Sequence, residues 1–402
     1  MAARLTVAGD AVRFAARRIL DTVRDSGPLW TASLLLDRIL PYGVLGLWPD
    51  KIVSPEALAE QVEALLCKWG MSPAHASVTV AHVLYADLHG IDSHGCSMLL
   101  HYHRGVLEGS LTMTPTIAVV RESEATALID GGGGLGHVPA DTAMKLAIAK
   151  CRDVGLAAVA VRNSGHYGAA GAYASMAAQS GFVGIATTST KTPALVPTFG
   201  VEAKLGTNPI AFAAPAGRHP PFLLDMATST AAVGALAQAW RKGLAIPAGW
   251  ALAPNGRPVT NGRRAAVYRR LTPLGSSREM GSHKGYGLAT MVEILSAIMP
   301  GLGSASAAAD TGARVGHFFL AIDPRRFREP GEFEGDLDAL IDSLHSCAPL
   351  NPDQSVLVAG DPEHAALTER RRSGIPLARA VVEDLRSVAR TSGVRFILDA
   401  NR

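Results

Sequence analysis

The sequence predicts an α/β fold, and three observations carry this prediction. Apolar runs typical of β-strands recur between residues 117 and 230, and longer runs with helical periodicity separate them, a pattern that favours helices packed on a sheet. Hydrophobic residues make up 48% of the 402-residue chain, which is enough for a large core. Aromatic residues contribute only 5%, while Ala and Gly are abundant, so helices and sheet can approach closely.

The first part of the chain is predicted to be helical. Residues 1–53 form a helical N-terminal extension with an amphipathic, Arg-bearing start, and residues 54–116 form a second helical segment. Ser54 can cap the first helix of that segment, and the proline after it suits the first helical turn. The second helix, from about residue 73 to 88, leads into "LHGIDSHG", where Gly90 can adopt the left-handed cap conformation.

Residues 117–230 are expected to form the α/β core. The strand-like runs are "TIAVV", "ATALID", "LAAVAV", "VGIATTS", "PIAFAAP" and "PFLLDMA", and the helical runs are "ADTAMKLAIAKCRDVG" and "GAAGAYASMAAQSG". Residues 231–402 are expected to complete the fold with further helices, the strand "VGHFFLAID" and a helical C-terminal region.

Composition excludes several classes of partner. The net charge is +3, with acidic and basic residues interspersed, which argues against nucleic acid. No apolar run reaches the roughly 18 residues that a membrane span needs. Four cysteines lie far apart without a CxxC pair, as expected for reduced thiols in a cytoplasmic protein.

A glycine run imitates a dinucleotide-binding fingerprint. Gly131, Gly133 and Gly136 have G-x-G-x-x-G spacing between a predicted strand and a helix, and Asp153 lies about 20 residues on. A run of four glycines matches this pattern almost by default, however, and no following strand ends in an acid at the right place. We therefore interpret the run as a glycine turn.

Four loops carry titratable groups among glycines or small residues at predicted element ends. His94 lies in "DSHG", His166 in "NSGHYGAAGAYA", Asp225 at the end of the strand "FLLDM", and Lys284 in "GSHKGYG" before an apolar helix. Each has an ordinary alternative: a polar turn, a surface histidine, a helix N-cap or a solvated lysine. Their combination is hard to explain structurally and indicates an active site, in which helix N-termini could bind anions.

Five ordered motifs, "DSHG", "NSGHYGAAGAYA", "GTNPIAFAAP", "LLDMATS" and "HKGYGLATMVEILS", resemble the type-2 malate/L-lactate dehydrogenase family. That family includes L-sulfolactate and ureidoglycolate dehydrogenases, diketogulonate reductase and piperideine-2-carboxylate reductase. The resemblance runs from about Ser54 to the C-terminus and includes "GHFFLAIDP". It implies a non-Rossmann, L-sulfolactate dehydrogenase-like fold with a mixed sheet core and flanking helical N- and C-terminal regions. It also implies NAD or NADP as cofactor, a small-molecule substrate and a homodimer.

The resemblance assigns roles to particular residues. His94 would donate a proton to the substrate carbonyl, His166 is the other acid/base candidate, and Asp225 would contact the reactive centre. Hydride transfer to C2 of a 2-oxo acid leaves an alkoxide, which a histidine can protonate near neutral pH. A carboxylate can assist the histidine by orienting its ring. The residues expected to contact the cofactor are Ser189, Thr190, Asp225, Met226, Ala227, Thr228, Ser229, His283, Lys284 and Gly285.

Two positions depart from the family pattern. Many relatives have an arginine four residues after the S-H-G histidine to grip the substrate carboxylate, and here that residue is Met98. Many also have a lysine where this chain has Ala235. We predict that Ser93, Met98 and Arg104 contact the substrate. Arg104 could replace the missing arginine, as could His101 or His103.

The sequence also allows other functions. The chain could reduce a cyclic imino acid or another non-standard substrate, or it could be a weakened, ligand-binding member of the family. A metal site formed by His82, His89, Asp92 and His94 matches no zinc-ligand spacing, so no metal is expected.

Overall fold

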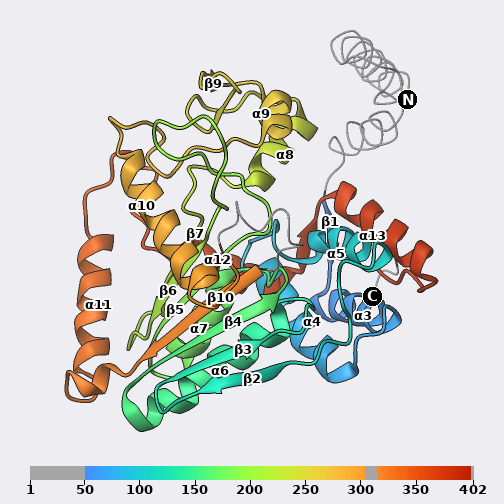
Figure 1. Ribbon diagram of the computed structural model, residues 1–402. Coiled ribbons are helices and arrows are strands. Elements are labelled where there is room, and N and C mark those ends of the chain that lie inside the picture. Colours follow the sequence, from blue (N-terminus) through green and yellow to red (C-terminus); the bar gives the residue numbers. More distant parts are fainter. Residues whose placement is uncertain (1–49, 304–314, 400–402) are drawn as a thin grey trace.

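The computed structural model describes residues 50–303 and 315–399, and a seven-stranded sheet lies at their centre (Figure 1). The strand order is β2-β3-β4-β10-β5-β6-β7. β3 and β4 are parallel, and all other neighbours are antiparallel, so the sheet is mixed, as expected. The strands are β2 (Ala118–Glu122), β3 (Thr126–Asp130), β4 (Leu156–Ser164), β5 (Val183–Thr188), β6 (Ile210–Ala214), β7 (Phe222–Met226) and β10 (Val315–Ile322).

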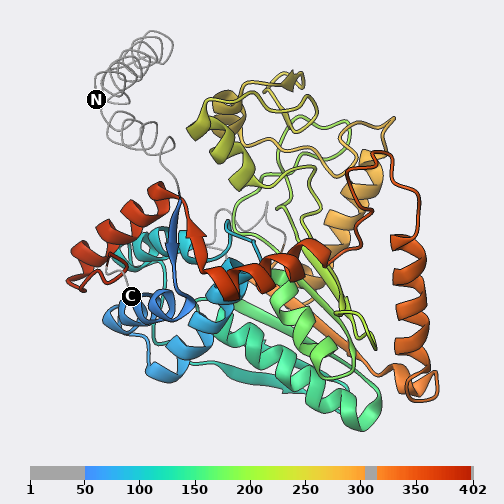
Figure 2. The same cartoon turned by 180° about the vertical axis from the view of Figure 1, so that it is seen from behind.

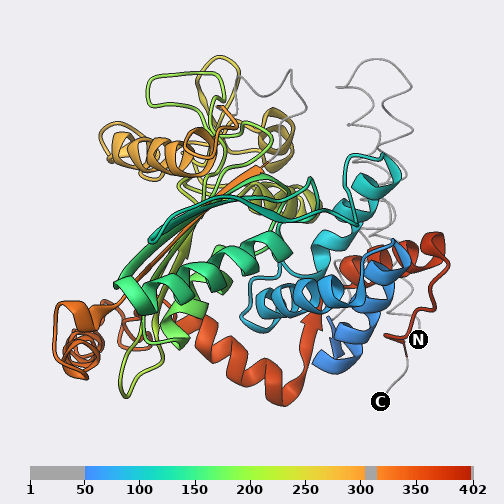
Figure 3. The ribbon, with the colours of Figure 1, turned by 60° about the horizontal axis from the view of Figure 1, so that its bottom comes forward.

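Helices cover both faces of this sheet (Figure 3). α6 (His137–Val154) and α7 (Ala170–Gln179) lie on one face, and α10 (Ser282–Glu293) with the π-helical turn η2 (Ile294–Ile298) lies on the other. Small residues make the contact close, as the composition predicts. The ideal Cβ of an alanine at Gly184 on β5 would overlap the backbone of α7, so only glycine fits there.

A helical layer flanks the sheet and joins the two ends of the described chain. It contains α3 (Pro55–Lys68), α4 (Pro73–Leu88), the 3-10 turn η1 (Cys96–Met98), α5 (Leu99–Leu107) and α13 (Arg379–Ser392), which share one apolar core. β1 (Lys51–Val53) pairs with β11 (Ile375–Leu377) beside them. The predicted cap is confirmed, because the Ser54 side chain accepts a hydrogen bond from the Ala57 N–H at 3.1 Å. Gly90 has the predicted left-handed conformation, with φ +79°.

Two further groups of elements lie at the periphery. α8 (Val233–Lys242), β8 (Ala251–Leu252), β9 (Pro258–Val259) and α9 (Gly262–Tyr268) surround a third apolar core at the top of Figure 1. After β10 the chain forms the 3-10 turn η4 (Pro324–Arg326), α11 (Glu332–His345) and α12 (Asp361–Ser373). Figure 2 shows α12 in front of α7, running toward the helical layer, where it packs on α4.

The strand directions bring the predicted functional loops to one edge of the sheet. β4 and β5 both run antiparallel to β10. β6 is antiparallel to both β5 and β7, so β7 runs parallel to β5. The ends of β3, β4, β5 and β7 and the starts of β6 and β10 therefore share one edge. Loops at such an edge are the usual place for a ligand site in an α/β sheet.

The N-terminal extension predicted for residues 1–53 lies outside the described residues except for its last part, which includes β1. None of the helices in residues 50–303 and 315–399 combines the length and the apolar character that a bilayer-spanning helix needs.

Candidate active site

Two histidines from distant parts of the sequence face each other at the shared edge. His94 lies in the turn between α4 and η1, and His166 lies between β4 and α7. Their rings are stacked, with centroids 5.5 Å apart. Sequence reasoning named both residues, and the fold brings them together.

The hydrogen bonds of His166 define which of its nitrogens carries the proton. The Gly168 N–H donates to His166 Nδ1 at 3.3 Å, and the hydroxyl oxygen of Tyr102 lies 2.7 Å from the same nitrogen. A backbone N–H can only donate, so Nδ1 is an acceptor and the proton of the neutral ring resides on Nε2. Burial lowers the pKa of His166 to about 3, with the charges of neighbouring histidines adding to the effect. His166 is therefore neutral at physiological pH.

His94 has a different environment. The His94 Nδ1 lies 2.8 Å from the Ser93 hydroxyl oxygen, and the backbone N–H of His94 donates to the Ile91 carbonyl at 2.9 Å. Burial lowers the pKa of His94 below the ordinary histidine value, so this ring is also neutral near pH 7. Ser93 is exposed and lies near the first turn of α8, where the ideal Cβ at Gly234 would be 3.7 Å from the Ser93 Cβ.

Asp225 contacts a helix rather than a histidine. It lies in β7, and its Oδ2 accepts a hydrogen bond from the Gly171 N–H in the first turn of α7 at 2.7 Å. The alternative in which Asp225 caps a helix that follows it is excluded, because the next helix begins at Val233. Burial raises the pKa of Asp225 to about 6, and the nearby charge of Glu363 adds to the rise.

The segments predicted to contact the cofactor adjoin one another beside this centre. The Leu274 N–H donates to the Thr228 carbonyl at 2.9 Å. Gly285 at the start of α10 packs so closely on Leu274 that a Cβ would overlap its backbone. His283 and Lys284 are exposed in the first turn of α10, and Arg278 donates to His283 Nδ1 at 2.8 Å. The predicted segments 225–229 and 283–285 thus adjoin each other through Leu274.

Ser189 and Thr190 follow the end of β5 and lie in the same part of the molecule. The Gly316 N–H donates to the Ser189 hydroxyl at 3.1 Å. Thr190 packs directly against Gly206, where a Cβ would overlap the Thr190 hydroxyl. The Thr228 hydroxyl donates to the Asn208 carbonyl at 3.0 Å, which links this corner to β7.

Sequence reasoning missed two residues that organise the centre. Tyr102 on α5 is buried and contacts His166, as described above. His317 on β10 bridges two strand ends, because its Nε2 lies 2.9 Å from Ser164 Oγ and its Nδ1 lies 2.7 Å from Thr188 Oγ1. The histidine in "GHFFLAIDP" was a visible signal for the second residue. Nothing in the pattern marked the tyrosine.

The glycine run supports the His166 loop with its backbone. Gly131 and Gly136 donate their N–H groups to the carbonyls of Arg162 and His166 at 2.8 and 2.9 Å. The run does lie in a β3-α6-β4 unit with parallel strands, so the local pattern of a dinucleotide fold is present. Asp153, however, lies in α6 rather than at the end of the next strand. These contacts support the interpretation as a structural glycine turn.

The residues proposed to bind the substrate carboxylate fall into two groups. Met98 is partly buried against the apolar core of the helical layer. His103 turns into that layer as well, where it stacks on Trp69 with ring centroids 5.3 Å apart, so the suggestion that it binds substrate is wrong. His101 and Arg104 are exposed on α5. Burial lowers the pKa of His101, and the charges of Arg104 and, to a smaller extent, Lys191 lower it further, so two positive charges lie near His101.

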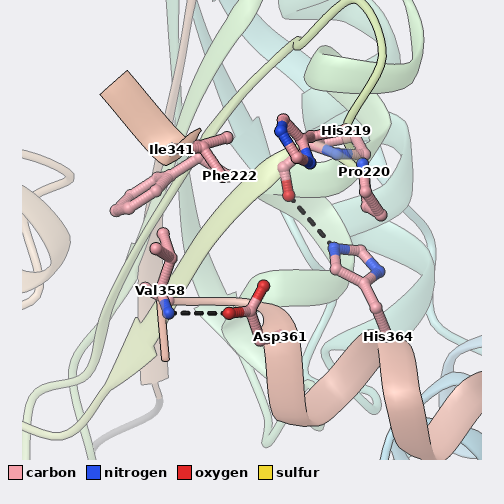
Figure 4. A pocket seen from close by; sticks show the side chains of 9 residues that line it. His219, Pro220, Phe222, Ile341, Val358, Asp361 and His364 are labelled. Carbon is pink, nitrogen blue, oxygen red and sulfur yellow. Dashed lines mark hydrogen bonds between the residues drawn. The ribbon is translucent and has the colours of Figure 1, made fainter. Parts of the chain in front are cut away.

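No cluster of three or more potential metal ligands occurs in the described part of the chain. A small pocket of about 20 Å³, room for about one water molecule, lies at the opposite end of β7 (Figure 4). Phe222, Ile341 and Val358 line it, and His364 Nε2 lies 3.1 Å from the Pro221 carbonyl oxygen there. It is separate from the histidine pair.

Comparison with known proteins identifies the family of the chain. A family model described as malate/L-lactate dehydrogenase matches residues 53–386. The chain belongs to this family. It is 40% identical to a malate dehydrogenase from Pyrococcus horikoshii over 347 residues, covering 85% of this chain and 96% of the relative. It is 35% identical to an L-sulfolactate dehydrogenase from Methanothermobacter thermautotrophicus over 345 residues, covering 84% and 96%.

A solved structure shows the same fold in this family. The crystal structure of malate dehydrogenase from Entamoeba histolytica superposes with a TM-score of 0.83 at 30% identity, covering 86% of this chain and 99% of that one. The L-sulfolactate dehydrogenase-like fold expected from the motifs is thus confirmed. As a family member, the chain is an oxidoreductase, a dehydrogenase that acts on the CH–OH group of hydroxy acids.

Proposed function

We propose that this chain interconverts a 2-hydroxy acid and its 2-oxo acid with NAD or NADP, and that His94 transfers the proton. The observation that carries the proposal is the pair of stacked, neutral histidines at the sheet edge where the loops of β4, β5 and β7 meet. When bound, the nicotinamide accepts or supplies the hydride. Every other step belongs to the side chains of this protein.

The surface beside the histidines fits such a cofactor. His283 and Lys284 are exposed in the first turn of α10, with Arg278 beside them. Cations at a helix N-terminus suit a diphosphate. Segment 225–229 adjoins this turn, because the Thr228 carbonyl accepts a hydrogen bond from the Leu274 N–H beside it, so Ser189, Thr190 and residues 225–229 would line the remainder of the cofactor.

The environments of the two histidines suggest different tasks. His94 is neutral, and a neutral imidazole can take the hydroxyl proton when the hydroxy acid is oxidised and return it in the reverse reaction. His166 has its Nδ1 occupied by two donors and its pKa lowered to about 3, which makes it a weak base. Its Nε2–H can instead donate a hydrogen bond to the substrate oxygen, as a neutral histidine can in electrophilic catalysis.

Glutamine substitutions distinguish these tasks, because an amide can donate a hydrogen bond but cannot exchange a proton at neutral pH. His166→Gln should retain measurable turnover, whereas His94→Gln should lose at least about a hundredfold, the usual scale for a lost general acid or base. Steady-state oxidation of L-malate with NAD or NADP measures both. Greater loss in His166→Gln than in His94→Gln would reverse the assignment.

We infer a carboxylate-bearing substrate from the positive charges of Arg104 on α5 and of Lys191, which lie near His101. Arg104 and His101 are exposed, and the charge of Lys191 acts on the same histidine. The two relatives are named malate dehydrogenase and L-sulfolactate dehydrogenase. Malate and sulfolactate are therefore the first acids to test.

We also propose a cytoplasmic homodimer. Cys67, Cys96, Cys151 and Cys347 are all free thiols, which suits a reducing compartment. The dimer follows from the resemblance in sequence, and light scattering of the purified protein tests it: a monomeric mass would contradict it.

A further inference from the structure

The loop that carries His94 is exposed, yet its geometry must be maintained for proton transfer. Asp92 and Ser93 are exposed, and the loop leaves α4 through Gly90 in a left-handed conformation. Two anchors hold the loop, and one of them comes from the C-terminal part of the chain.

The first anchor lies beneath the loop. The Asp87 carboxylate, which is buried in the last turn of α4, accepts a hydrogen bond from the Cys96 N–H at 2.8 Å. Gly95 lies directly on this carboxylate, and a Cβ at that position would overlap it. The residues after His94 are thus attached to the helix before it.

The second anchor is Arg370 on α12. Its NH1 donates to the Asp87 carbonyl at 2.5 Å and to Asp92 Oδ1 at 2.5 Å, and its NH2 lies 3.4 Å from Asp92 Oδ2. The Asp87 carbonyl is one of the carbonyls that a helix leaves without an internal partner at its C-terminus. Arg370 satisfies that carbonyl and, through the same nitrogen, holds the carboxylate two residues before His94.

The arginine is far less exposed than its partner. The Arg370 side chain is 14% exposed and that of Asp92 is 60% exposed. Ala366, one turn earlier on α12, fixes the approach, because it lies 3.3 Å from the ideal Cβ position at Gly90. Most surface ion pairs contribute little because both side chains move freely. Here the cation is held by the packing of α12 on α4, so it can restrain the loop.

We propose that Arg370 is a positioning residue, which acts through Asp92 to hold His94 in its catalytic orientation. The proposal rests on the proposed role of His94. A displacement of about 1 Å at a reacting group can cost about a hundredfold in rate, so a restraint two residues from His94 affects turnover without contacting substrate.

The test compares Arg370→Gln, Arg370→Lys and Asp92→Asn, with Arg372→Gln as the matched control. Arg372 lies on the same helix and pairs with Glu369 at the surface, with 78% of its side chain exposed. We expect Arg370→Gln and Asp92→Asn each to lower kcat about tenfold to hundredfold with little change in cofactor Kd. The double variant should lose no more than either single one, because both remove the same contact. Lysine lacks the planar fork that reaches carbonyl and carboxylate together, so Arg370→Lys should be intermediate.

A merely structural role for Arg370 predicts different results. In that case kcat per folded molecule would stay at the wild-type value while the melting temperature falls, or the losses of the two single variants would multiply. Either result would overturn the proposal, as would an Arg372→Gln variant with the same loss.

Hydrogen exchange separates this proposal from the proposed function. Amides of residues 88–98 should exchange faster in Arg370→Gln than in wild type, while those of α6 stay unchanged. Faster exchange in a protein that oxidises no hydroxy acid would refute the proposed function and leave the anchor intact. Unchanged exchange in an active protein would refute the anchor alone.

Discussion

At the residue scale, the proposed catalytic side chains share one feature, which is that burial controls their charge. His94 and His166 both have lowered pKa values because they are desolvated, and Asp225 has a raised pKa for the same reason. A buried carboxylate that is ionised at neutral pH destabilises the fold, and such groups are retained where function needs them.

Asp225→Asn should therefore stabilise the protein and impair it. The pKa of Asp225 is about 6 in the folded state, above the ordinary value of 3.8, so the folded state binds more protons between these values and stability falls as pH rises through them. Asparagine carries no charge, and its amide oxygen can still accept the Gly171 N–H. Thermal unfolding should show a gain of roughly 1–3 kcal/mol at about pH 7 that disappears near pH 4, together with reduced turnover. A variant that loses stability at pH 7 but keeps normal turnover would show that the carboxylate serves the fold instead.

The substitution at position 98 predicts a change in substrate preference. Met98 packs toward the apolar core of the helical layer, so we expect binding of a carboxylate to depend on Arg104, farther along α5. Pyruvate and oxaloacetate should be poor substrates, and Met98→Arg should lower their KM by about tenfold or more, since a charge-assisted contact contributes about 1.5–3 kcal/mol. If wild type reduces them efficiently and Met98→Arg gives no gain, Arg104 already binds the carboxylate, and Arg104→Ala should then raise KM.

At the element scale, most helices and strands could be predicted from the sequence, because their apolar periodicity is strong. The helix after Ser54 and the strands "VGIATTS" and "PFLLDMA" lie within a few residues of their predicted positions. The insertion of β10 between β4 and β5 could not be predicted, since it pairs residue 317 with residues 161 and 188. Local patterns contain no information about such long-range pairing, and this is why His317 was missed.

Tyr102 was missed for a related reason. It lies eight residues after His94 on α5, surrounded by other histidines, and only the packing of α5 against the His166 loop gives it a role. The histidines themselves could be predicted, because glycine-flanked loops at strand ends are a local feature.

One element-scale prediction concerns α11, which the Asp338 carboxylate anchors. This buried side chain accepts hydrogen bonds from the N–H groups of three consecutive residues at 3.2, 2.7 and 3.1 Å. The three residues, Gly217, Arg218 and His219, lie between β6 and β7, at the edge opposite the histidine pair. Asp338→Ala should destabilise the protein by about 1–3 kcal/mol and leave kcat unchanged, as measured by thermal unfolding and steady-state kinetics.

Asp336→Ala is the control for that variant, because Asp336 lies on the same helix and forms an exposed pair with Arg328, which precedes the helix, and such pairs contribute little. An equal loss of stability in both variants, or none in Asp338→Ala, would show that the carboxylate does not anchor α11.

At the scale of the whole molecule, the fold places residues from the N-terminal, central and C-terminal parts around one sheet edge. His94 comes from the helical layer, His166 and Asp225 from the strands of the central sheet and the loops that follow them, and Arg370 from α12, which runs toward the helical layer. The single βαβ unit at β3-α6-β4 shows why a local glycine pattern misleads. The rest of the sheet is antiparallel.

Removal of residues 1–50 should leave the chemistry intact. The family match begins at residue 53, and β1 keeps its pairing with β11 in the shortened chain. Activity per folded molecule should therefore fall less than stability or solubility. Active-site titration measures the first, and thermal unfolding measures stability. Complete loss of activity in a folded, shortened protein would show that the extension contributes to the site.

The most direct test of the central claim is nicotinamide reduction by wild type and His94→Ala with a 2-hydroxy acid. L-malate, sulfolactate and L-lactate are each supplied with NAD and with NADP, and the absorbance of the reduced nicotinamide is followed while cofactor binding is measured by fluorescence. We expect wild type to turn over at least one of these acids and His94→Ala to lose at least about a hundredfold in kcat with an unchanged cofactor Kd. Near-normal turnover in a folded His94→Ala variant would contradict the claim that His94 transfers the proton.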